Sequence, residues 1–353
     1  MIRYVSNRLT VLELCAGGGG QALGLEQAGF ESAALGEIDP HACATLRANR
    51  PHWRVEEADL CEFDAADFRG VDLVAAGVPC PPFSIAGKQL GANDERDLFP
   101  AALRVVEQTR PRAVMLENVR RFATARFDNY RSDLLRQLLA WGYDAQWHVL
   151  NASDYGVPQL RPRFVLVGIR AAKRPFDGPQ CQESGTTVGS VLGPLMGARD
   201  WPGLKEWRLR AQGIGPTIVG GSKKHGGPDL GPTRAKRQWR SLGVDGLGIA
   251  NEPPGPEFPA AGFPRLTIPL VAALQGFPGD WRFAGKKTAA YRQVGNAFPP
   301  PAAAVVGQEI SHALGAGGNE RRHRRRILEE SAAAVYKAVQ EGRGSRRSGC
   351  QRP

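Results

Sequence analysis

The sequence lacks the features that mark membrane, secreted and metal-binding proteins. No stretch approaches the roughly 18 unbroken apolar residues of a membrane span, and the start, MIRYVSNRLTVLEL, lacks the basic, apolar and small-residue order of a signal peptide. The six cysteines show neither zinc-ligand spacing nor the density of a disulfide framework, and the six histidines show no HxxxH or HxH. We therefore expect a cytoplasmic protein with reduced thiols, no bound metal and no membrane partner.

Acidic residues are scarce in two regions, so the formal net charge of +11 is unevenly distributed. Residues 319–353 carry ten Lys and Arg against four acids, residues 171–264 carry twelve against eight, and the rest of the chain is almost neutral. Two basic regions in an otherwise near-neutral chain are typical of a protein that binds a polyanion. For residues 319–353 the alternative is a tail that only keeps the chain soluble.

Apolar, β-rich runs recur through the first half and alternate with helical patterns such as QALGLEQAG and DLFPAALRVVEQT. This alternation predicts an α/β fold with a doubly wound, mostly parallel sheet, in which ligands bind at the carboxyl ends of the strands. The expected strands are residues 10–15, 33–38, 71–76, 113–118, 147–152 and 163–169.

Gly and Pro become frequent and helical periodicity fades between residues 171 and 264, which predicts a smaller, loop-rich second domain. Regular patterns return at LTIPLVAALQGFP and PAAAVVGQEISHAL, so we expect residues 265–315 to pack with residues 1–170 as one catalytic domain. Residues 316–353 begin with a glycine-rich linker and are expected to form a basic, flexible tail.

A run of four glycines, Gly17 to Gly20, lies between the first expected strand and a helix. Glycine serves where φ is positive or where a ligand approaches the backbone, although dehydrogenases use such turns too. Glu37 ends the next strand, where it can accept both hydroxyls of a ribose, and Asp59 follows in EADL, where it can accept from an adenine amine. Without a phosphate-binding lysine, these residues fit a nucleoside such as S-adenosylmethionine. The alternative is that both acids cap helices.

A single cysteine, Cys80, follows the run VDLVAA within GVPCPPFSIAGKQLG, where neighbouring prolines stiffen the loop. A lone cysteine is usually a small buried hydrophobe. Here Glu117, in the run AVMLEN, and Arg161 and Arg163, in QLRPRF, are expected at the same edge of the sheet. Together they provide a nucleophile, an acid and two cations.

These motifs, in this order, resemble those of the bacterial DNA cytosine-5 methyltransferase family. The resemblance runs from LELCAGGGG through GEID, GVPCPPFSIAGKQ, LENV and QLRPRF to LQGFP and QVGNAFPPP, over about residues 10–310. It implies a Rossmann-like enzyme that transfers a methyl group from S-adenosylmethionine to carbon 5 of a flipped-out cytosine in a specific double-stranded DNA sequence. Two departures are Cys15, where the family usually has an aromatic residue, and Pro81, where it has glutamine.

The resemblance also implies a role for each residue of the site. Cys80 attacks carbon 6 of the cytosine to form a covalent adduct, while Glu117 hydrogen-bonds ring nitrogen 3. Arg161 and Arg163 are expected to lower the pKa of the Cys80 thiol. Arg163 also holds the exocyclic oxygen of the base, and the Val78 carbonyl accepts from its amine. The residues expected to bind the cofactor are Cys15, Ala16, Gly17, Gly18, Gly19, Gly20, Glu37, Ile38, Asp59, Leu60, Gly77, Pro79, Leu98, Asn296 and Ala297.

Residues 171–264 are expected to form the target-recognition domain, which reads the DNA sequence. Thr217 and Ile218 resemble the family's threonine–aliphatic pair, and six Lys and Arg against one acid lie between Ser222 and Ser241. The loop SIAGKQLGANDERDLF is expected to close over the flipped nucleotide, the alternative being a solvated loop. The residues expected to contact DNA are Ser84, Lys88, Gln89, Arg96, Gln159, Thr217, Lys223, Lys224, Arg234, Lys236 and Arg237.

Two other interpretations stay open: a tRNA cytosine-5 methyltransferase of the same fold, and a catalytically inactive relative that only recognises DNA. The basic domain at residues 171–264 argues against the first, and the intact Cys80 and Glu117 argue against the second. A nicotinamide dehydrogenase is disfavoured because no GxGxxG fingerprint is present. We further expect a monomer that associates with the nucleoid through DNA and belongs or is related to a restriction–modification system, with a possible cognate restriction endonuclease.

Overall fold

The computed structural model describes residues 8–79, 97–181, 184–221 and 227–316 of the 353-residue chain. Residues Met1–Leu314 form one compact unit, and Gly315–Pro353 form a second. Among the helices in the described ranges, none is long and apolar enough to cross a membrane. The same ranges contain no group of three His, Cys, Asp or Glu side chains that could hold a metal ion.

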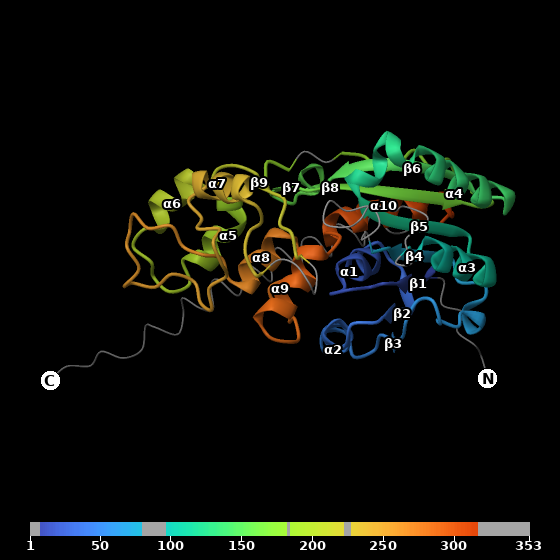
Figure 1. Cartoon of the computed structure of the whole chain (residues 1–353), viewed down its shortest axis with the longest axis horizontal. Coiled ribbons are helices and arrows are strands. Elements are labelled where there is room, and N and C mark those ends of the chain that lie inside the picture. Colours follow the sequence, from blue (N-terminus) through green and yellow to red (C-terminus); the bar gives the residue numbers. More distant parts are fainter. Residues whose placement is uncertain (1–7, 80–96, 182–183, 222–226, 317–353) are drawn as a thin grey trace. The chain divides into compact units, whose positions relative to one another are not determined.

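A seven-stranded sheet lies at the centre of the compact unit (Figure 1). Its order is β3-β2-β1-β4-β5-β8-β6, and only β8 runs antiparallel to its neighbours. The expected α/β class and mostly parallel sheet are therefore confirmed. The strands of this sheet are β1 (Thr10–Leu14), β2 (Glu31–Glu37), β3 (Val55–Glu57), β4 (Leu73–Gly77), β5 (Ala113–Val119), β6 (Asp144–Asn151) and β8 (Pro162–Ile169). A separate parallel pair joins β7 (Gln159–Leu160) to β9 (Gly215–Pro216).

Helices cover the sheet because its strands are apolar on both faces. Leu12 and Leu14 of β1 share a core cluster with Val106 of α3 and Leu138 of α4. The helices are α1 (Gly20–Gln27), α2 (Pro40–Asn49), α3 (Phe99–Thr109), α4 (Asp128–Ala140), α5 (Val188–Met196), α6 (Leu204–Arg210), α7 (Thr233–Ser241), α8 (Ile268–Leu274), α9 (Lys287–Asn296) and α10 (Pro300–Ala313). Short 3-10 turns are η1 (Ala66–Phe68), η3 (Arg120–Ala123), η4 (Ala125–Phe127) and η5 (Ala152–Tyr155).

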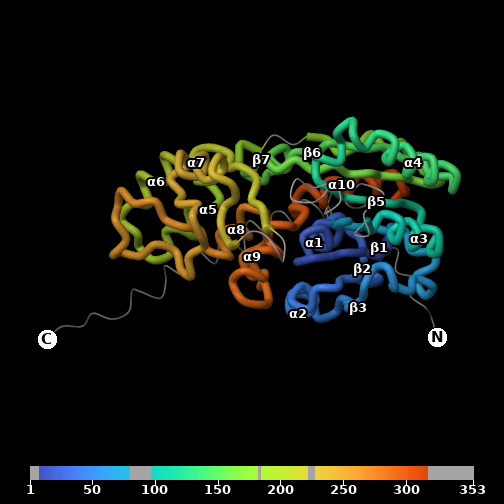
Figure 2. Tube along the Cα trace, viewed as in Figure 1, coloured from blue at the N-terminus to red at the C-terminus, as the bar shows by residue number. Residues whose placement is uncertain are grey.

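The first and last helices of the compact unit pack directly on each other, although they are far apart in the sequence. The tube in Figure 2 shows α1, in blue, beside α10, in orange-red, and the two helices contact along their length. Glycines allow this approach, since a Cβ on Gly24 would lie 2.5 Å from the Pro300 carbonyl oxygen and a Cβ on Gly307 would lie 2.8 Å from Ala28 Cβ. Residues near 300 thus lie against the helix that follows the first strand.

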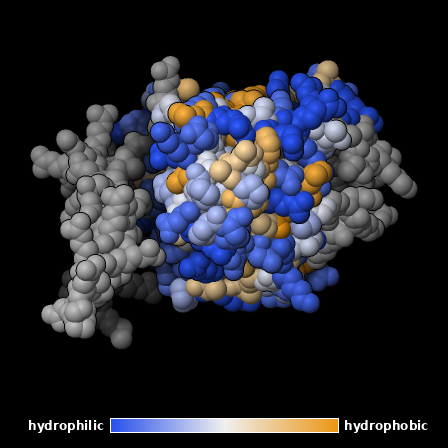
Figure 3. All heavy atoms as spheres, turned by 90° about the vertical axis from the view of Figure 1, so that its left-hand side faces the viewer, coloured by the Kyte–Doolittle hydropathy of each residue, from blue (hydrophilic) through white to orange (hydrophobic). Residues whose placement is uncertain are grey.

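Residues 171–264 contain more helix than the sequence indicated. We expected helical periodicity to fade there, but α5, α6 and α7 all lie in this region. The apolar residues Val188, Leu192 and Met196 of α5 keep a helical spacing, but the helix also contains Gly189, Gly193 and Pro194, which disfavour helix formation. The apolar core also continues into this region, since Leu46 and Trp239 belong to one cluster. In Figure 3, hydrophilic side chains cover most of the visible face, with apolar ones scattered among them.

Candidate active site

The glycine turn between β1 and α1 contains one glycine that faces open space. Gly17 has a φ of +54°, and a Cβ added to it would meet nothing within 4 Å. The next three are packed: a Cβ on Gly19 would lie 2.8 Å from Trp281, and one on Gly20 would lie 2.4 Å from the Phe298 carbonyl oxygen. Gly17 is therefore the position at which a ligand can approach the turn. Gly19 and Gly20 instead allow the turn to pack closely against Trp281 and Phe298.

Cys15 begins this turn with a φ of +55° and is half-buried. Burial and then Glu37 raise the pKa of its thiol, so Cys15 remains protonated at neutral pH. A protonated thiol is a weak nucleophile. Cys15 therefore takes the place of the family's aromatic residue without adding a second reactive group.

Glu37, at the end of β2, is held by the backbone on both carboxylate oxygens. Its Oε2 accepts from the Gly17 N–H at 2.7 Å, and its Oε1 accepts from Ile38 and Asp39 at 2.9 and 2.8 Å. The N-cap of α2 is Asp39, whose side chain accepts from the His41 N–H. Glu37 therefore does not cap a helix, and it fixes the glycine turn to the end of the second strand.

Asp59, which we expected to accept a hydrogen bond from an adenine amine, lies after β3 and is exposed. Its Oδ1 accepts from the Cys61 N–H at 2.9 Å, which closes a turn and not a helix. Ile38, beside Glu37, is 60% exposed, an unusual position for an isoleucine. The ends of β2 and β3 thus present two carboxylates and an apolar side chain.

Glu117 and Arg163 form a buried ion pair between neighbouring strands. Glu117 lies on β5 and Arg163 at the start of β8, and Arg163 Nε lies 2.6 Å from Glu117 Oε1 with both side chains about one-tenth exposed. Burial raises the pKa of Glu117, while Arg163 and then Arg161 lower it, and the net direction is upward. The expected pairing of an acid with a cation at this edge is present, with Arg163 as the partner.

Gly77 connects this acid to the glycine turn. A Cβ on Gly77 would lie 3.4 Å from the Cys15 carbonyl oxygen and 3.9 Å from Glu117 Oε2. The end of β4 therefore lies between the two parts of the candidate site. Because Gly77 comes three residues before Cys80, the chain is directed toward the expected nucleophile from this position.

Asn118 is a contributor that the sequence analysis did not assign. It is 1% exposed, its Nδ2 donates to the Val78 carbonyl at 3.3 Å, and its Oδ1 accepts from the Val119 N–H at 2.8 Å. Val78 is the residue whose carbonyl we expected to accept from the cytosine amine. A carbonyl oxygen has two lone pairs, so Asn118 orients this carbonyl and leaves one lone pair available. The signal in the sequence was its position next to Glu117 in LENV.

Arg161 does not reach the rim where we expected it, and this is a correction. Its side chain is 1% exposed, with Nη1 donating to the Ile218 carbonyl at 2.5 Å and Nη2 to those of Gly295 and Ala297 at 2.7 Å. Burial lowers the pKa of Arg161, and Arg163 adds to this. Arg161 lies between β7 and β8, and its carbonyl acceptors draw the side chain into the interior.

Gln159 is a second correction, because we expected it to contact DNA. It is fully buried, its Oε1 accepts from the Ile218 N–H at 2.8 Å, and its Nε2 donates to Gln275 Oε1 at 3.2 Å. With both ends of its amide bonded inside the protein, Gln159 has no surface with which to contact a nucleic acid. A buried amide of this kind is satisfied by its neighbours, as such groups usually are.

Asn296 and Ala297, both expected at the cofactor, lie at the end of α9 with different partners. Asn296 is exposed and its Nδ2 donates to the Gly221 carbonyl at 3.2 Å. Ala297 is buried, and its Cβ would lie 3.1 Å from a Cβ on Gly20. The residues between α9 and α10 therefore contact the glycine turn through Ala297.

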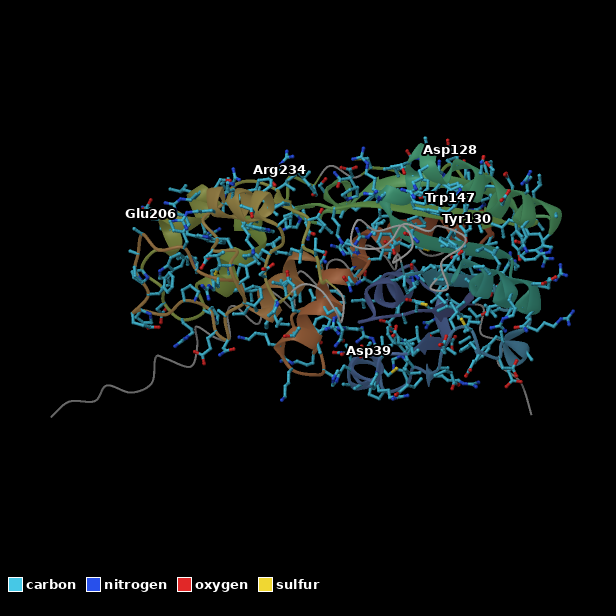
Figure 4. The ribbon with its side chains drawn as sticks, in the orientation of Figure 1. Asp39, Asp128, Tyr130, Trp147, Glu206 and Arg234 are labelled. Carbon is cyan, nitrogen blue, oxygen red and sulfur yellow. The ribbon has the colours of Figure 1, made fainter. Side chains whose placement is uncertain are left out.

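The residues expected to contact DNA lie in different surroundings. Arg234, labelled in Figure 4, and Arg237 are exposed on α7. Lys236 is half-buried and paired with Asp229 at 2.8 Å, and the hydroxyl of Thr217 donates to the Leu160 carbonyl. The remaining predictions fall outside the described residues: Cys80, Ser84, Lys88, Gln89, Arg96, Lys223 and Lys224.

The strand order, the glycine turn after β1 and the acid at the end of β2 define a Rossmann-like methyltransferase fold. The family of C-5 cytosine-specific DNA methylases matches residues 9–211 and 223–312, so the chain belongs to this family. It is a DNA cytosine-5 methyltransferase.

Two relatives are about half identical to the chain. The type II methyltransferase M.NaeI of Lentzea aerocolonigenes is 52% identical over 311 residues, which cover 87% of this chain and 75% of M.NaeI. The type II methyltransferase M.NgoMIV of Neisseria gonorrhoeae is 49% identical over 312 residues, which cover 87% and 98%.

Solved structures share the fold at lower identity. The Dnmt2 methyltransferase of S. pombe superposes with a TM-score of 0.60 at 19% identity over 87% of this chain and 98% of its own. The Entamoeba histolytica methyltransferase EhMeth gives a TM-score of 0.62 at 14% identity over 88% and 99%. At these identities the likeness supports the fold alone.

Proposed function

We propose that this enzyme transfers the methyl group of S-adenosylmethionine to carbon 5 of a flipped-out cytosine within a specific double-stranded DNA sequence. The observation that carries the proposal is the buried pair of Glu117 and Arg163, which lies one glycine away from the turn at Cys15. A buried acid with a raised pKa, placed beside a cofactor turn, suits the activation of a cytosine ring.

The residues around the glycine turn fit S-adenosylmethionine. Gly17 leaves open space beside the turn, and the exposed Ile38 offers an apolar surface for an adenine. Backbone N–H groups use three of the about four acceptor positions on the Glu37 carboxylate, which leaves one for a ribose hydroxyl and not the two we expected. Asp59 would accept from the adenine amine. When bound there, S-adenosylmethionine supplies an electrophilic methyl group.

The side chains of this chain would activate the cytosine. The Cys80 thiolate adds to carbon 6, which makes carbon 5 nucleophilic, and Glu117 donates a hydrogen bond to ring nitrogen 3, where negative charge develops. Arg163 fixes the orientation of Glu117 through their ion pair. After transfer, loss of the carbon 5 proton and elimination of the Cys80 sulfur restore the aromatic ring. A base inside a stacked duplex is out of reach, so the base has to be flipped out.

The match to the family of DNA methylases supports DNA as the substrate over tRNA, and exposed cations such as Arg234 and Arg237 on α7 suit a polyanion. M.NaeI and M.NgoMIV are named type II methyltransferases, which belong to restriction–modification systems, and we propose the same setting for this enzyme. A cognate endonuclease would be its functional partner. The proposed cytoplasmic location follows from the DNA substrate.

Bisulfite sequencing of a plasmid from cells that express the protein tests this function. We expect protected cytosines at one recurring sequence, and none when the plasmid encodes Cys80→Ser, because an alcohol is far less ionised than a thiol at neutral pH. A duplex with 5-fluorocytosine at the identified position should form a covalent adduct with the wild type, since fluorine cannot leave as a proton. Unmethylated plasmid, or methylation by Cys80→Ser, would contradict the proposal.

A further inference from the structure

The backbone of residues 215–221 lies directly against the end of α9. A Cβ on Gly295 would lie 2.5 Å from the Gly220 N and Cα atoms, and a Cβ on Gly220 would lie 2.5 Å from the Arg292 carbonyl oxygen. Only glycine permits this contact, because no side chain fits between the two backbones. Segment 215–221 leads into Lys223 and Lys224, the pair of cations that we propose to contact DNA.

Arg161 connects this segment to the C-terminal end of α9 and to Ala297, which follows it. One guanidinium nitrogen holds the Ile218 carbonyl, and the other holds the carbonyls of Gly295 and Ala297. No carboxylate of the described residues lies within ion-pair distance of Arg161. Burying a cation with carbonyl partners alone carries a large desolvation cost, which these hydrogen bonds offset only in this arrangement of the three carbonyls.

Gln159 and Gln275 form a second connection between segment 215–221 and α9. Gln159 accepts from the Ile218 N–H, and Gln275 connects Gln159 to the Val294 carbonyl at 2.9 Å. The Ile218 carbonyl is thus bonded to Arg161, which holds the end of α9 directly, and its N–H is bonded to Gln159, which reaches α9 through Gln275. Ile218 cannot shift without disturbing this end of the helix.

The same end of α9 touches the glycine turn on its other side. The Phe298 carbonyl oxygen and Ala297 Cβ lie 2.4 and 3.1 Å from the position of a Cβ on Gly20. A contiguous set of contacts therefore runs from Ile218 through Arg161 and Ala297 to Gly20. Close-packed contacts of this kind transmit a displacement because the backbones have no free space between them.

We propose that Arg161 is a positioning residue that couples DNA recognition to cofactor binding. The inference rests on the proposed function and deepens it. DNA held at segment 215–221 stabilises the arrangement of Ile218 that Arg161 fixes, and the same guanidinium holds Ala297 against the cofactor turn. By linkage, the cofactor strengthens DNA binding by the same factor.

The coupling factor is the measurement that tests the inference. Calorimetry gives the affinity of the full chain for S-adenosylhomocysteine, alone and with a duplex that carries the sequence identified by bisulfite sequencing. We expect the duplex to tighten binding about 5- to 150-fold in the wild type, the usual range of such couplings. In Arg161→Lys the factor should fall toward one, because an ammonium keeps the charge but lacks the planar fork that spans three carbonyls.

A control variant separates coupling from the loss of an arginine–carbonyl contact. Arg112 also holds a backbone carbonyl, that of Leu314 at 2.6 Å, together with Asp72 at 2.9 Å, and it lies just before β5, at the amino ends of the strands. Arg112→Lys should keep the coupling factor of the wild type. Equal loss in both variants would overturn the inference.

A second pair of variants tests the same contact without touching Arg161. Gly220→Ala places a Cβ 2.5 Å from the Arg292 carbonyl and 2.6 Å from Asn296 Oδ1, while a Cβ on Gly227 meets nothing within 4 Å. Gly220→Ala should reduce the coupling factor, and Gly227→Ala should not. If Arg161→Lys does not fold, the comparison of Gly220→Ala with Gly227→Ala still tests the coupling.

The possible results separate this inference from the proposed function. A wild type that methylates cytosine but binds S-adenosylhomocysteine equally with and without the duplex would overturn the coupling and leave the function intact. Full coupling in both Arg161→Lys and Gly220→Ala would overturn it as well. A wild type that does not methylate cytosine would instead contradict the function.

Discussion

Glu117 is a buried carboxyl group with a pKa above that of an ordinary glutamic acid. Burial raises its pKa more than the neighbouring arginines lower it, so the proton persists to a higher pH than on an ordinary glutamic acid. Since the protonated form is the one that donates to the cytosine ring, methyl transfer should decline as the pH rises through the raised pKa. We therefore expect the titration of Glu117 to determine the pH above which the rate of methyl transfer declines.

Glu117→Gln tests this assignment at the level of one residue. The amide can donate a hydrogen bond but cannot exchange a proton, so we expect the single-turnover rate to fall by about 10²- to 10⁴-fold and its alkaline decline to disappear. Glu206→Gln, at an exposed position on α6 (Figure 4), should keep both the rate and the profile. An unchanged alkaline decline in Glu117→Gln would assign that titration to another group.

The sequence predicted which residues approach the site better than it predicted their partners. Glu117 and Arg163 were placed at one edge because their strands end or begin there, and topology alone brings them together. Arg161 and Gln159 were misassigned because their acceptors come from residues 218, 275, 295 and 297, which are distant in the sequence. A local motif identifies a polar side chain, but its burial depends on those distant segments.

At the level of elements, the glycine turn contains positions that require glycine for different reasons. Gly17 and Gly70 both have positive φ with nothing within 4 Å of an added Cβ, so alanine is strained equally at each. Both Gly17→Ala and Gly70→Ala should lower the free energy of unfolding by about 1–2 kcal/mol. Only Gly17→Ala should also weaken S-adenosylhomocysteine binding in calorimetry, because its methyl group enters the space we assign to the ligand.

Equal affinities in the two alanine variants would place the cofactor away from Gly17. The turn itself was predictable because four glycines follow an apolar run. The helices of residues 171–264 were not, since Gly189, Gly193 and Pro194 of α5 disfavour a helix although its apolar residues keep a helical spacing. Frequent glycine and proline in a segment therefore did not exclude helices there.

At the level of the whole molecule, most of the net positive charge lies in residues 171–264 and residues 319–353. An enzyme that ends at Gly318 loses ten Lys and Arg against four acids. We expect it to methylate the same sequence, with weaker DNA binding and a shallower dependence of affinity on salt, because fewer counterions are released. Binding titrations at several salt concentrations, together with bisulfite sequencing, measure both properties. A changed target sequence would assign recognition to the last 35 residues.

The contact between α1 and α10 also affects how the chain is synthesised. Gly24 lies near the beginning of the chain and Gly307 near its end, and the ribosome needs on the order of 15 to 60 seconds to add the residues between them. During that time the nascent chain contains the glycine turn but not Ala297, Phe298 or α10, against which the turn packs. The proposed cofactor site is therefore completed long after its glycine turn is made, and the enzyme becomes able to bind its methyl donor only once α10 has been synthesised.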